Sequence, residues 1–286
     1  MILSTQTDVT ASRYGLTKAV EMIAAAGFDA VDLSMFENKE NEWMFKDGFE
    51  KGINEAMKAA DACGVYFNQA HAPFPSYRVG DEEYNKKIRP MLIRSIEIAG
   101  MAGVKNIVVH PVVFPENQKE NNLKMYNELL PHAKKAGVKI ALENMWGRDP
   151  RRGCIMPNVC SVASELADYV DSLDEEWFTV CLDIGHVGLV GEYEGDFIRE
   201  LGGKRLTCLH MHDNDYVHDS HTAPMTMRLP WGEICKALAD IEYKGDFTLE
   251  ADNFLRPLPD GFYATGLKFM SEAGRYLIGL IENKEG

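Results

Sequence analysis

The stretch Ala136-Gly137-Val138-Lys139-Ile140-Ala141-Leu142-Glu143-Asn144 holds the unit from which the fold can be inferred. It begins where a helical pattern ends on a glycine, a residue that readily takes the left-handed conformation of a helix C-terminus. The apolar run 139–142 that follows is typical of a short buried strand. A carboxylate, Glu143, comes directly after the strand. This order of helix, glycine, strand and polar residue recurs along the chain.

Seven other apolar or β-branched runs have the same character, and segments of helical periodicity separate them. Glycine joints of the same type lie at 26–28, 63–65, 102–104 and 244–246. Strands that alternate with helices indicate parallel βαβ units, and eight such units favour a closed (β/α)8 barrel, a TIM barrel, that spans residues 1–286 as one domain. The predicted strands are Ile2–Thr5, Ala30–Leu33, Val65–Gln69, Asn106–Val109, Lys139–Leu142, Phe178–Leu182, Leu206–Leu209 and Phe247–Leu249.

The composition argues against several classes of protein. Of the 286 residues, 45% are hydrophobic, as in a globular protein with a large core, and the formal net charge is −14. An acidic surface disfavours a nucleic-acid or membrane partner. No apolar run approaches the roughly 20 residues of a membrane span, and the start of the chain lacks the pattern of a signal peptide. The six cysteines form no Cys-x-x-Cys pair, which indicates reduced thiols in a cytoplasmic protein.

Six consecutive predicted strands, from the third to the eighth, are followed by a residue of a type that binds metal ions. In a (β/α)8 barrel the C-terminal ends of the strands meet at one mouth, where the active site lies. Carboxylates gathered there repel one another unless a cation neutralises them. The six residues are His71, His110, Glu143, Asp183, His210 and Glu250.

Two further imidazole–carboxylate pairs strengthen the predicted metal site. His186 follows Asp183 by three residues, and Asp219 and His221 lie in the loop after the seventh strand. Mixed Glu, Asp and His donors suit Mn²⁺, Zn²⁺, Co²⁺ or Fe²⁺ better than Ca²⁺, and the pattern leaves the choice among these four open. We therefore expect divalent metal at the mouth.

At these residues the chain resembles the xylose isomerase-like TIM-barrel superfamily. Its members include sugar and sugar-phosphate isomerases, ketose 3-epimerases, inosose dehydratase, hydroxypyruvate isomerase and endonuclease IV. The matching motifs run in the family's order from the third strand to the eighth, which makes the resemblance specific for the superfamily. The motifs do not indicate a particular substrate. The matching motifs are His71-Ala72-Pro73, Val109-His110-Pro111, Leu142-Glu143-Asn144, Asp183-Ile184-Gly185-His186, His210-Met211-His212-Asp213-Asn214 and Leu249-Glu250.

The resemblance to the epimerases implies roles for particular residues. It implies one metal ion held by Glu143, Asp183, His210 and Glu250. It also implies that Glu143 and Glu250 move a proton on and off the carbon beside a carbonyl, and that His186 contacts a substrate oxygen. The expected function is therefore isomerisation or epimerisation of a small sugar-like molecule by α-proton transfer, through an enediolate that the metal stabilises.

Three alternatives remain open. The endonuclease IV branch holds three zinc ions, and its additional ligands match a set that is complete in this chain: His71, His110, His186, Asp219 and His221. The resemblance therefore also allows a trinuclear zinc phosphodiesterase that acts on abasic DNA, although the loop after Glu143 and the first strand differ from the nuclease pattern. A lyase or dehydratase would use the same enolate chemistry, and a non-enzymatic binder would keep the ligands alone.

The loop after the fifth strand carries a local positive patch in an acidic chain. Arg148, Arg151 and Arg152 lie within ten residues of Glu143, and arginine binds carboxylate and phosphate groups in a bidentate way. We expect these arginines to recognise an anionic group of the substrate; surface salt bridges and a contact in a homo-oligomer are the alternatives. Aromatic residues in the mouth loops are expected to stack on a substrate ring or to pack the loops: Phe36, Trp43, Phe74, Tyr77 and Trp146.

Overall fold

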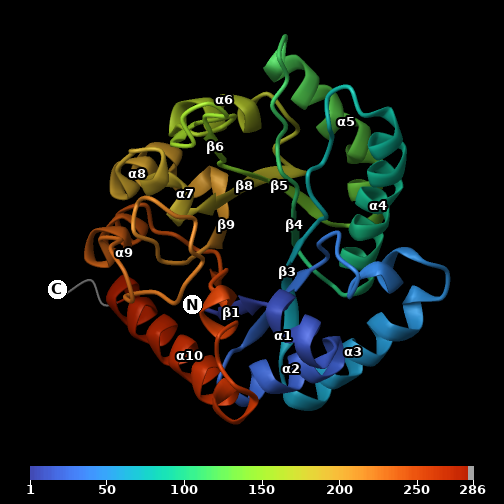
Figure 1. Cartoon of the computed structure of the whole chain (residues 1–286), viewed down its shortest axis with the longest axis vertical. Coiled ribbons are helices and arrows are strands. Elements are labelled where there is room, and N and C mark those ends of the chain that lie inside the picture. Colours follow the sequence, from blue (N-terminus) through green and yellow to red (C-terminus); the bar gives the residue numbers. More distant parts are fainter. Residues whose placement is uncertain (283–286) are drawn as a thin grey trace.

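Eight parallel strands form a ring at the centre of the molecule. The computed structural model describes residues 1–282, and Figure 1 looks down the ring. Hydrogen bonds join the strands in the order β10-β1-β2-β3-β4-β5-β8-β9. These strands are β1 (Leu3–Gln6), β2 (Ala30–Ser34), β3 (Tyr66–His71), β4 (Asn106–Val108), β5 (Lys139–Glu143), β8 (Phe178–Asp183), β9 (Leu206–His210) and β10 (Phe247–Leu249).

The ring closes between β9 and β10 through the residue that follows β9. Met211 forms an isolated parallel bridge with Leu249. The Met211 amide donates to the Thr248 carbonyl at 2.9 Å, and the Met211 carbonyl accepts from the Glu250 amide at 3.2 Å. The closing bonds therefore fix the backbone beside His210 and Glu250, two of the predicted metal ligands.

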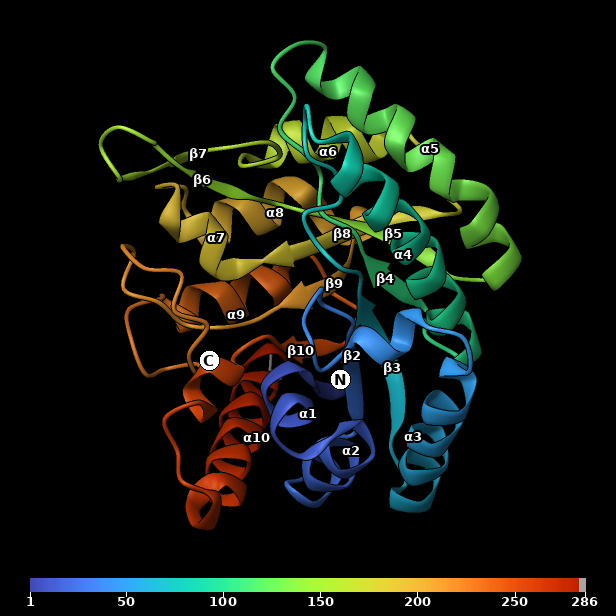
Figure 2. The same ribbon diagram turned by 45° about the vertical axis from the view of Figure 1, so that its right-hand side comes forward.

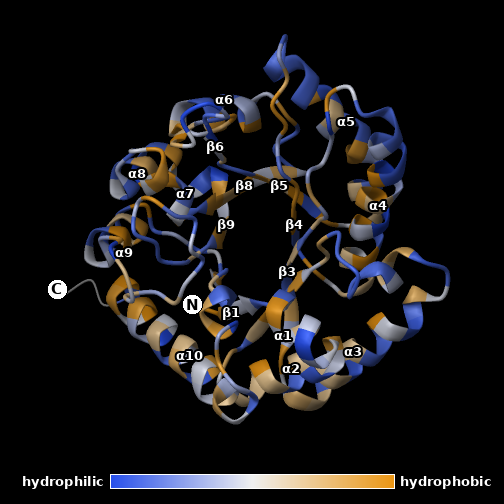
Figure 3. Ribbon diagram, viewed as in Figure 1, coloured by the Kyte–Doolittle hydropathy of each residue, from blue (hydrophilic) through white to orange (hydrophobic). Residues whose placement is uncertain are grey.

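Helices pack around the outside of the ring, and Figure 3 shows their apolar residues turned mainly toward the strands. No helix within residues 1–282 is long and apolar enough to cross a membrane. The helices are α1 (Asp8–Tyr14), α2 (Leu16–Ala25), α3 (Phe49–Cys63), α4 (Glu82–Met101), α5 (Gln118–Ala136), α6 (Ala163–Asp171), α7 (Ile184–Leu189), α8 (Glu194–Arg205), α9 (Trp231–Asp240) and α10 (Asp260–Glu282), with short 3-10 turns η1 (Glu42–Phe45) and η2 (Asp252–Leu255).

The predicted (β/α)8 barrel is confirmed, and each predicted strand overlaps an observed one with ends that differ by at most two residues. Gly137 has φ 71° and ψ 29°, so it ends α5 in the left-handed conformation as expected. The expectation was wrong for Gly245, because Glu242 is the left-handed residue after α9, with φ 52°. Gly245 instead provides space: a Cβ there would lie 2.2 Å from the Tyr243 hydroxyl oxygen.

Small side chains form a layer inside the barrel, directly below the predicted ligands. Alternate residues of a strand point to the same side, so residues two positions before an inward-facing ligand also face the interior. Four such residues form a separate buried cluster: Val108 before His110, Ala141 before Glu143, Cys181 before Asp183 and Cys208 before His210. The predicted metal ligands therefore lie directly above a layer of small apolar side chains. All six cysteines are free, as expected for reduced thiols.

A two-stranded antiparallel hairpin interrupts the barrel repeat after β5. It consists of β6 (Trp146–Arg148) and β7 (Ile155–Pro157). The sequence pattern predicts a loop here, because strands of three residues joined by an arginine-rich turn show no clear alternation of apolar and polar residues. Figure 2 shows the hairpin extending away from the barrel next to α7.

Candidate metal centre

The six strand-end residues meet at one mouth of the barrel, as the sequence predicted. Each sits at or just after the C-terminal end of its strand. Their side chains are almost completely buried, except for that of His110, which is 14% exposed. Ligand atoms from these residues and their neighbours fall into overlapping groups within which all atoms lie closer than 4.8 Å to one another.

The first group, named the His71 cluster, consists of His71, His110 and Glu143. The His110 Nε2 lies 3.0 Å from the His71 Nε2 and 3.0 Å from the Glu143 Oε2, and the His71 Nε2 lies 3.6 Å from the same oxygen. The His71 Nδ1 lies 2.7 Å from the Ala72 carbonyl oxygen. Because a carbonyl only accepts, Nδ1 carries the proton and the Nε2 lone pair faces the cluster.

The second group, named the Glu250 cluster, consists of Glu143, Asp183, His210 and Glu250. The His210 Nδ1 lies 3.3 Å from the Glu143 Oε1 and 3.3 Å from the Glu250 Oε2. Glu143 thus turns one carboxylate oxygen toward each of the first two clusters. This is the arrangement of a carboxylate that can bridge two ions.

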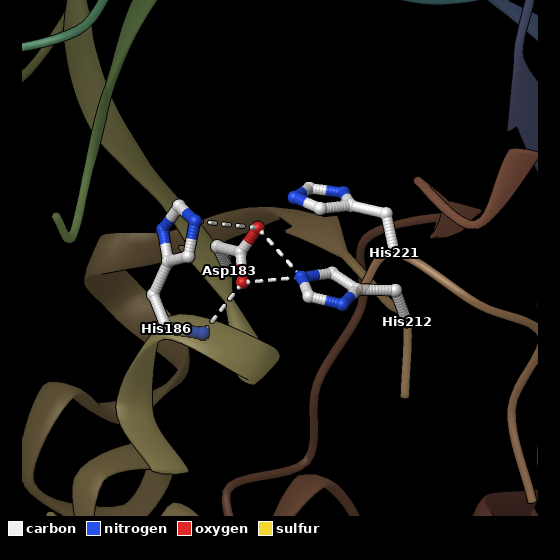
Figure 4. Close-up of side chains that lie close together, drawn as sticks. All are labelled: Asp183, His186, His212 and His221. Atoms are coloured by element: carbon white, nitrogen blue, oxygen red, sulfur yellow. Dashed lines mark hydrogen bonds and ion pairs between the residues drawn. The ribbon is translucent and has the colours of Figure 1, made fainter. Parts of the chain in front are cut away.

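The third group, named the His221 cluster, consists of Asp183, His186, His212 and His221. In Figure 4, His186 and His212 approach the Asp183 carboxylate from opposite sides, and the His221 ring lies above that of His212. The His212 Nε2 is 2.9 Å from the Asp183 Oδ1, and the two histidine rings stack with centroids 3.9 Å apart. Asp219 lies beside this cluster, with its Oδ1 3.1 Å from the His221 Nε2.

His212 is the member of these clusters that sequence reasoning missed. It belongs to the matched motif, but no role was predicted for it. The spacing could have pointed to it, because it lies two residues after His210 and an extended chain turns such residues to the same side. It is fully buried, and its Nδ1 has no hydrogen-bond partner among the described residues.

The donor atoms are spaced as a bound cation requires. Ligand atoms at about 2.0–2.1 Å from a tetrahedral ion lie roughly 3.4 Å from one another, and the separations of 3.0–3.6 Å in the His71 cluster and 3.3 Å in the Glu250 cluster are close to that value. Buried polar atoms usually have partners. Among the residues that the structure describes, the buried Glu143 Oε2 and Asp219 Oδ1 have no hydrogen-bond partner. The residues present therefore fit divalent metal ions.

The buried carboxylates of the mouth also favour a positive charge beside them. Burial disfavours the charged imidazole of His186, but the carboxylates of Asp183 and Asp219 outweigh it and raise the pKa of His186 to about 10. Burial opposes ionisation of Glu143, yet the imidazoles of His210 and His110 hold its pKa well below the ordinary value. Without a metal ion, the carboxylates of the mouth therefore favour a protonated, positively charged imidazole beside them, and a bound cation would supply the same positive charge.

Comparison with known proteins identifies the family. The model of the xylose isomerase-like TIM barrel family matches residues 20–273. The chain belongs to this family. The match includes every strand-end residue of the three clusters, which agrees with the resemblance seen in the sequence motifs.

Relatives within the xylose isomerase-like family are distant. An uncharacterised protein of Methanocaldococcus jannaschii is 27% identical over 83% of this chain and 80% of its own length, and a D-psicose 3-epimerase of Enterocloster bolteae is 24% identical over 82% and 75%. A solved D-tagatose 3-epimerase-like protein superposes with a TM-score of 0.78 at 22% identity, covering 100% of both chains. A solved IolI protein with a bound zinc atom gives 0.74 at 18% identity, covering 98% of both.

In this family member, the loop after β9 is held by one buried carboxylate. The Asp213 Oδ1 accepts hydrogen bonds from the amides of Asn214, Arg228 and Leu229, and the Oδ2 accepts from the Met227 amide and the Trp231 Nε1, all at 2.9–3.0 Å. The backbone of Asp213 also pairs with that of Thr222. Asp213 thereby closes the loop that carries Asp219 and His221 toward the mouth.

Replacement of Asp213 with Asn is expected to destabilise the protein by about 2–4 kcal/mol, because an amide nitrogen would face backbone and indole N–H donors that now share a charged acceptor. Urea unfolding followed by circular dichroism measures this change. Asp215→Asn is the matched control, since the Asp215 carboxylate binds amides of the same loop but is 35% exposed. Equal effects of the two substitutions would contradict the role of Asp213.

The aromatic residues divide into two sets. Phe36 and Phe74 lie over the His71 cluster: the Phe74 ring is 4.8 Å from that of His110 and 41% exposed, and the Phe36 ring is 4.9 Å from that of His71. On the opposite side, the Trp146 Nε1 donates to the Asp219 Oδ2 at 3.1 Å. These three residues border the mouth.

Trp43 and Tyr77 pack the loops around the mouth. The Trp43 ring lies so close to Gly52 of α3 that a Cβ there would be 2.4 Å from it. The Tyr77 ring packs on that of Phe114 at 5.5 Å. Both side chains pack against neighbouring elements, which is the second of the two alternatives that the sequence left open for the aromatic residues.

The three arginines lie in the hairpin and its turn. Arg148 donates to the Gly153 carbonyl, and its guanidinium lies 5.6 Å from the centre of the Trp146 ring. Arg151 and Arg152 are exposed, and their amides donate to the Asp149 carboxylate. Within residues 1–282, these guanidiniums form no salt bridge with a carboxylate. Their assignment to an anionic group of a substrate stays a prediction.

Proposed function

We propose that this protein is a divalent-metal-dependent isomerase or epimerase that acts on a sugar or sugar-like molecule. The observation that carries the proposal is the pair of buried glutamates, Glu143 and Glu250, each 3.3 Å from the Nδ1 of His210. A metal binder would need only the ligands, whereas inversion at a carbon uses two acid–base groups, one for each face of the substrate, and two buried carboxylates can supply them. The likeness to proteins named D-psicose and D-tagatose 3-epimerases supports the same chemistry.

The metal would be held by Glu143, Asp183, His210 and Glu250. A divalent ion bound there supplies a Lewis acid that polarises a substrate carbonyl and stabilises the negative charge that develops when the adjacent carbon loses its proton. The donor chemistry fits Mn²⁺, Zn²⁺, Co²⁺ and Fe²⁺. One glutamate would accept the proton that leaves the carbon, and the other, already protonated, would donate a proton to the carbon.

The environment of Glu250 favours this role. Burial raises the pKa of Glu250 to about 7, although the imidazoles of His210 and His221 oppose the rise. A raised pKa makes a carboxylate a stronger base, and a cation bound at the Glu250 cluster would lower that pKa again. We further propose that His186 binds a substrate hydroxyl and that the exposed face of Phe74 packs on the C–H side of a sugar.

Solvent exchange tests the proposal. The metal-loaded protein is incubated in deuterated water with D-fructose, D-tagatose and D-psicose, and proton NMR follows the hydrogen on the carbon next to the carbonyl. We expect loss of that resonance together with appearance of an isomer. An eliminated product with the same exchange would indicate a lyase or dehydratase. Absence of exchange across a panel of ketoses, aldoses and their oxidised forms would contradict the proposed chemistry.

A second candidate function rests on the overlap of the three clusters. Glu143 is shared by the His71 and Glu250 clusters, and Asp183 by the Glu250 and His221 clusters. Such shared carboxylates suit two or three ions close together, an arrangement used in phosphodiester hydrolysis. The second candidate is therefore a trinuclear zinc phosphodiesterase that acts at abasic sites in DNA.

We expect an abasic-site duplex to remain intact at protein concentrations for which an authentic abasic endonuclease cuts it completely. The reason is electrostatic: a chain with a net charge of −14 repels the phosphate backbone. Gel analysis of a labelled duplex, with the zinc-loaded protein, makes the measurement. Nicking that is abolished by Asp219→Ala and kept in Asp215→Asn would favour the second candidate over the first.

A further inference from the structure

Asp32 is a buried carboxylate that the proposed chemistry does not use. It lies in β2 and is 1% exposed. The Asp32 Oδ2 accepts a hydrogen bond from the Gln69 Nε2 at 3.0 Å, whereas the Oδ1 has no hydrogen-bond partner among the described residues. Burial of a carboxylate away from water is unfavourable in free energy unless a positively charged or proton-donating group faces it. The group that faces it is the imidazole of His210, whose Nε2 lies 3.6 Å from the Asp32 Oδ2.

The rings of three other histidines at the mouth are each fixed by a backbone carbonyl group. In each, Nδ1 lies against a backbone carbonyl oxygen, so Nδ1 carries the proton and Nε2 is left free to face the ligand atoms. The pairs are His71 with Ala72 at 2.7 Å, His186 with Asn144 at 2.8 Å and His221 with Glu250 at 2.9 Å.

His210 is oriented the other way round. Its Nδ1 faces the two glutamates at 3.3 Å, and its Nε2 points back into the barrel. The Nε2 has no hydrogen-bond partner within residues 1–282, so a backbone carbonyl does not fix this ring. A neutral imidazole that binds a cation through Nδ1 must carry its proton on Nε2, and that proton needs an acceptor. Asp32 is the acceptor that the fold provides.

We propose that Asp32 is a positioning residue for His210. Its carboxylate, 3.6 Å from Nε2, favours a proton on that nitrogen by its negative charge, which selects the tautomer with a free Nδ1 lone pair facing the Glu250 cluster. Gln69 in turn holds the Asp32 carboxylate in place. This inference rests on the proposed metal function, because the tautomer matters only if Nδ1 binds an ion.

Metal affinity tests the proposal without reference to catalysis. Zn²⁺ is titrated into metal-free protein in competition with a chromogenic chelator, for the wild type, Asp32→Asn and Glu194→Gln. Asp32→Asn is expected to weaken binding about 10- to 100-fold, the usual effect of losing a carboxylate behind a histidine ligand. Glu194→Gln is the matched control, because Glu194 is a buried carboxylate of α8, 4% exposed, that contacts none of the clusters; it should bind within about threefold of the wild type.

The outcomes separate this inference from the proposed function. Stoichiometric binding by the wild type with unchanged affinity in Asp32→Asn would overturn the role of Asp32 and leave the metal function standing. Failure of the wild type to bind zinc would overturn both. Equal weakening in both variants would also overturn the specific role of Asp32.

A second measurement needs no substitution and covers the case in which Asp32→Asn does not fold. Long-range proton–nitrogen NMR of the zinc-loaded wild type reports which nitrogen of each histidine carries the proton. We expect His210 to carry it on Nε2 and His71, His186 and His221 to carry it on Nδ1. A His210 proton on Nδ1 in the zinc-loaded protein would refute the proposal.

Discussion

Glu250→Gln is expected to lower the rate of deuterium incorporation into a substrate ketose by at least about a hundredfold, the usual contribution of a general base or acid. The amide keeps the size of the side chain and an oxygen that can bind metal, but it cannot take up a proton. The loss should therefore appear in kcat, with metal still bound. Proton NMR in deuterated water gives the rate, and elemental analysis of the same sample gives the metal content.

Glu194→Gln provides the control, since it also replaces a buried glutamate with an isosteric amide, outside the clusters. Its exchange rate should stay within about twofold of the wild type. A metal-loaded Glu250→Gln that exchanges at the wild-type rate would show that another group moves the proton. The proposal would then lose the observation on which it depends.

Loss of metal is the second large effect expected. Protein purified without chelator should contain at least one divalent ion per chain, and His210→Ala and Glu143→Ala should reduce this to background. The physical reason is that each substitution removes a donor from the Glu250 cluster and, for Glu143, also from the His71 cluster. Elemental analysis after dialysis measures the content. More than one ion in the wild type, reduced by one in His110→Ala, would identify the His71 cluster as a second site.

The same ions should stabilise the fold. A ligand present at 100 times its Kd adds about 2.7 kcal/mol to the free energy of unfolding. Chelator should therefore lower the Tm of the wild type, and it should leave the Tm of His210→Ala unchanged. His132→Ala is the control, because His132 lies in α5, away from the mouth. A wild type with background metal and no response to chelator would contradict the metal function.

The strand-end ligands could be predicted from the sequence because they depend on local spacing. Each barrel strand is a short apolar run, and the residue after it lies at the same end of the ring whatever the side chains around it do. The left-handed conformation of Gly137, which ends α5, could be predicted in the same way, because it depends only on that residue's own backbone angles. For Gly245 the deciding contact is with Tyr243 and the Thr207 carbonyl, and that contact exists only after α9 has packed.

The sequence by itself determined the barrel, its eight strands and the six residues that meet at its mouth, because a period of strand, helix and polar residue leaves few folds that bury every apolar run. Only the tertiary structure decided how the ligands group and what supports them. It brought His212 to Asp183, turned the two oxygens of Glu143 toward different clusters and set Asp32 of β2 behind His210 of β9. These contacts join residues up to 178 positions apart, and their geometry depends on the closure of the ring, which no local pattern records.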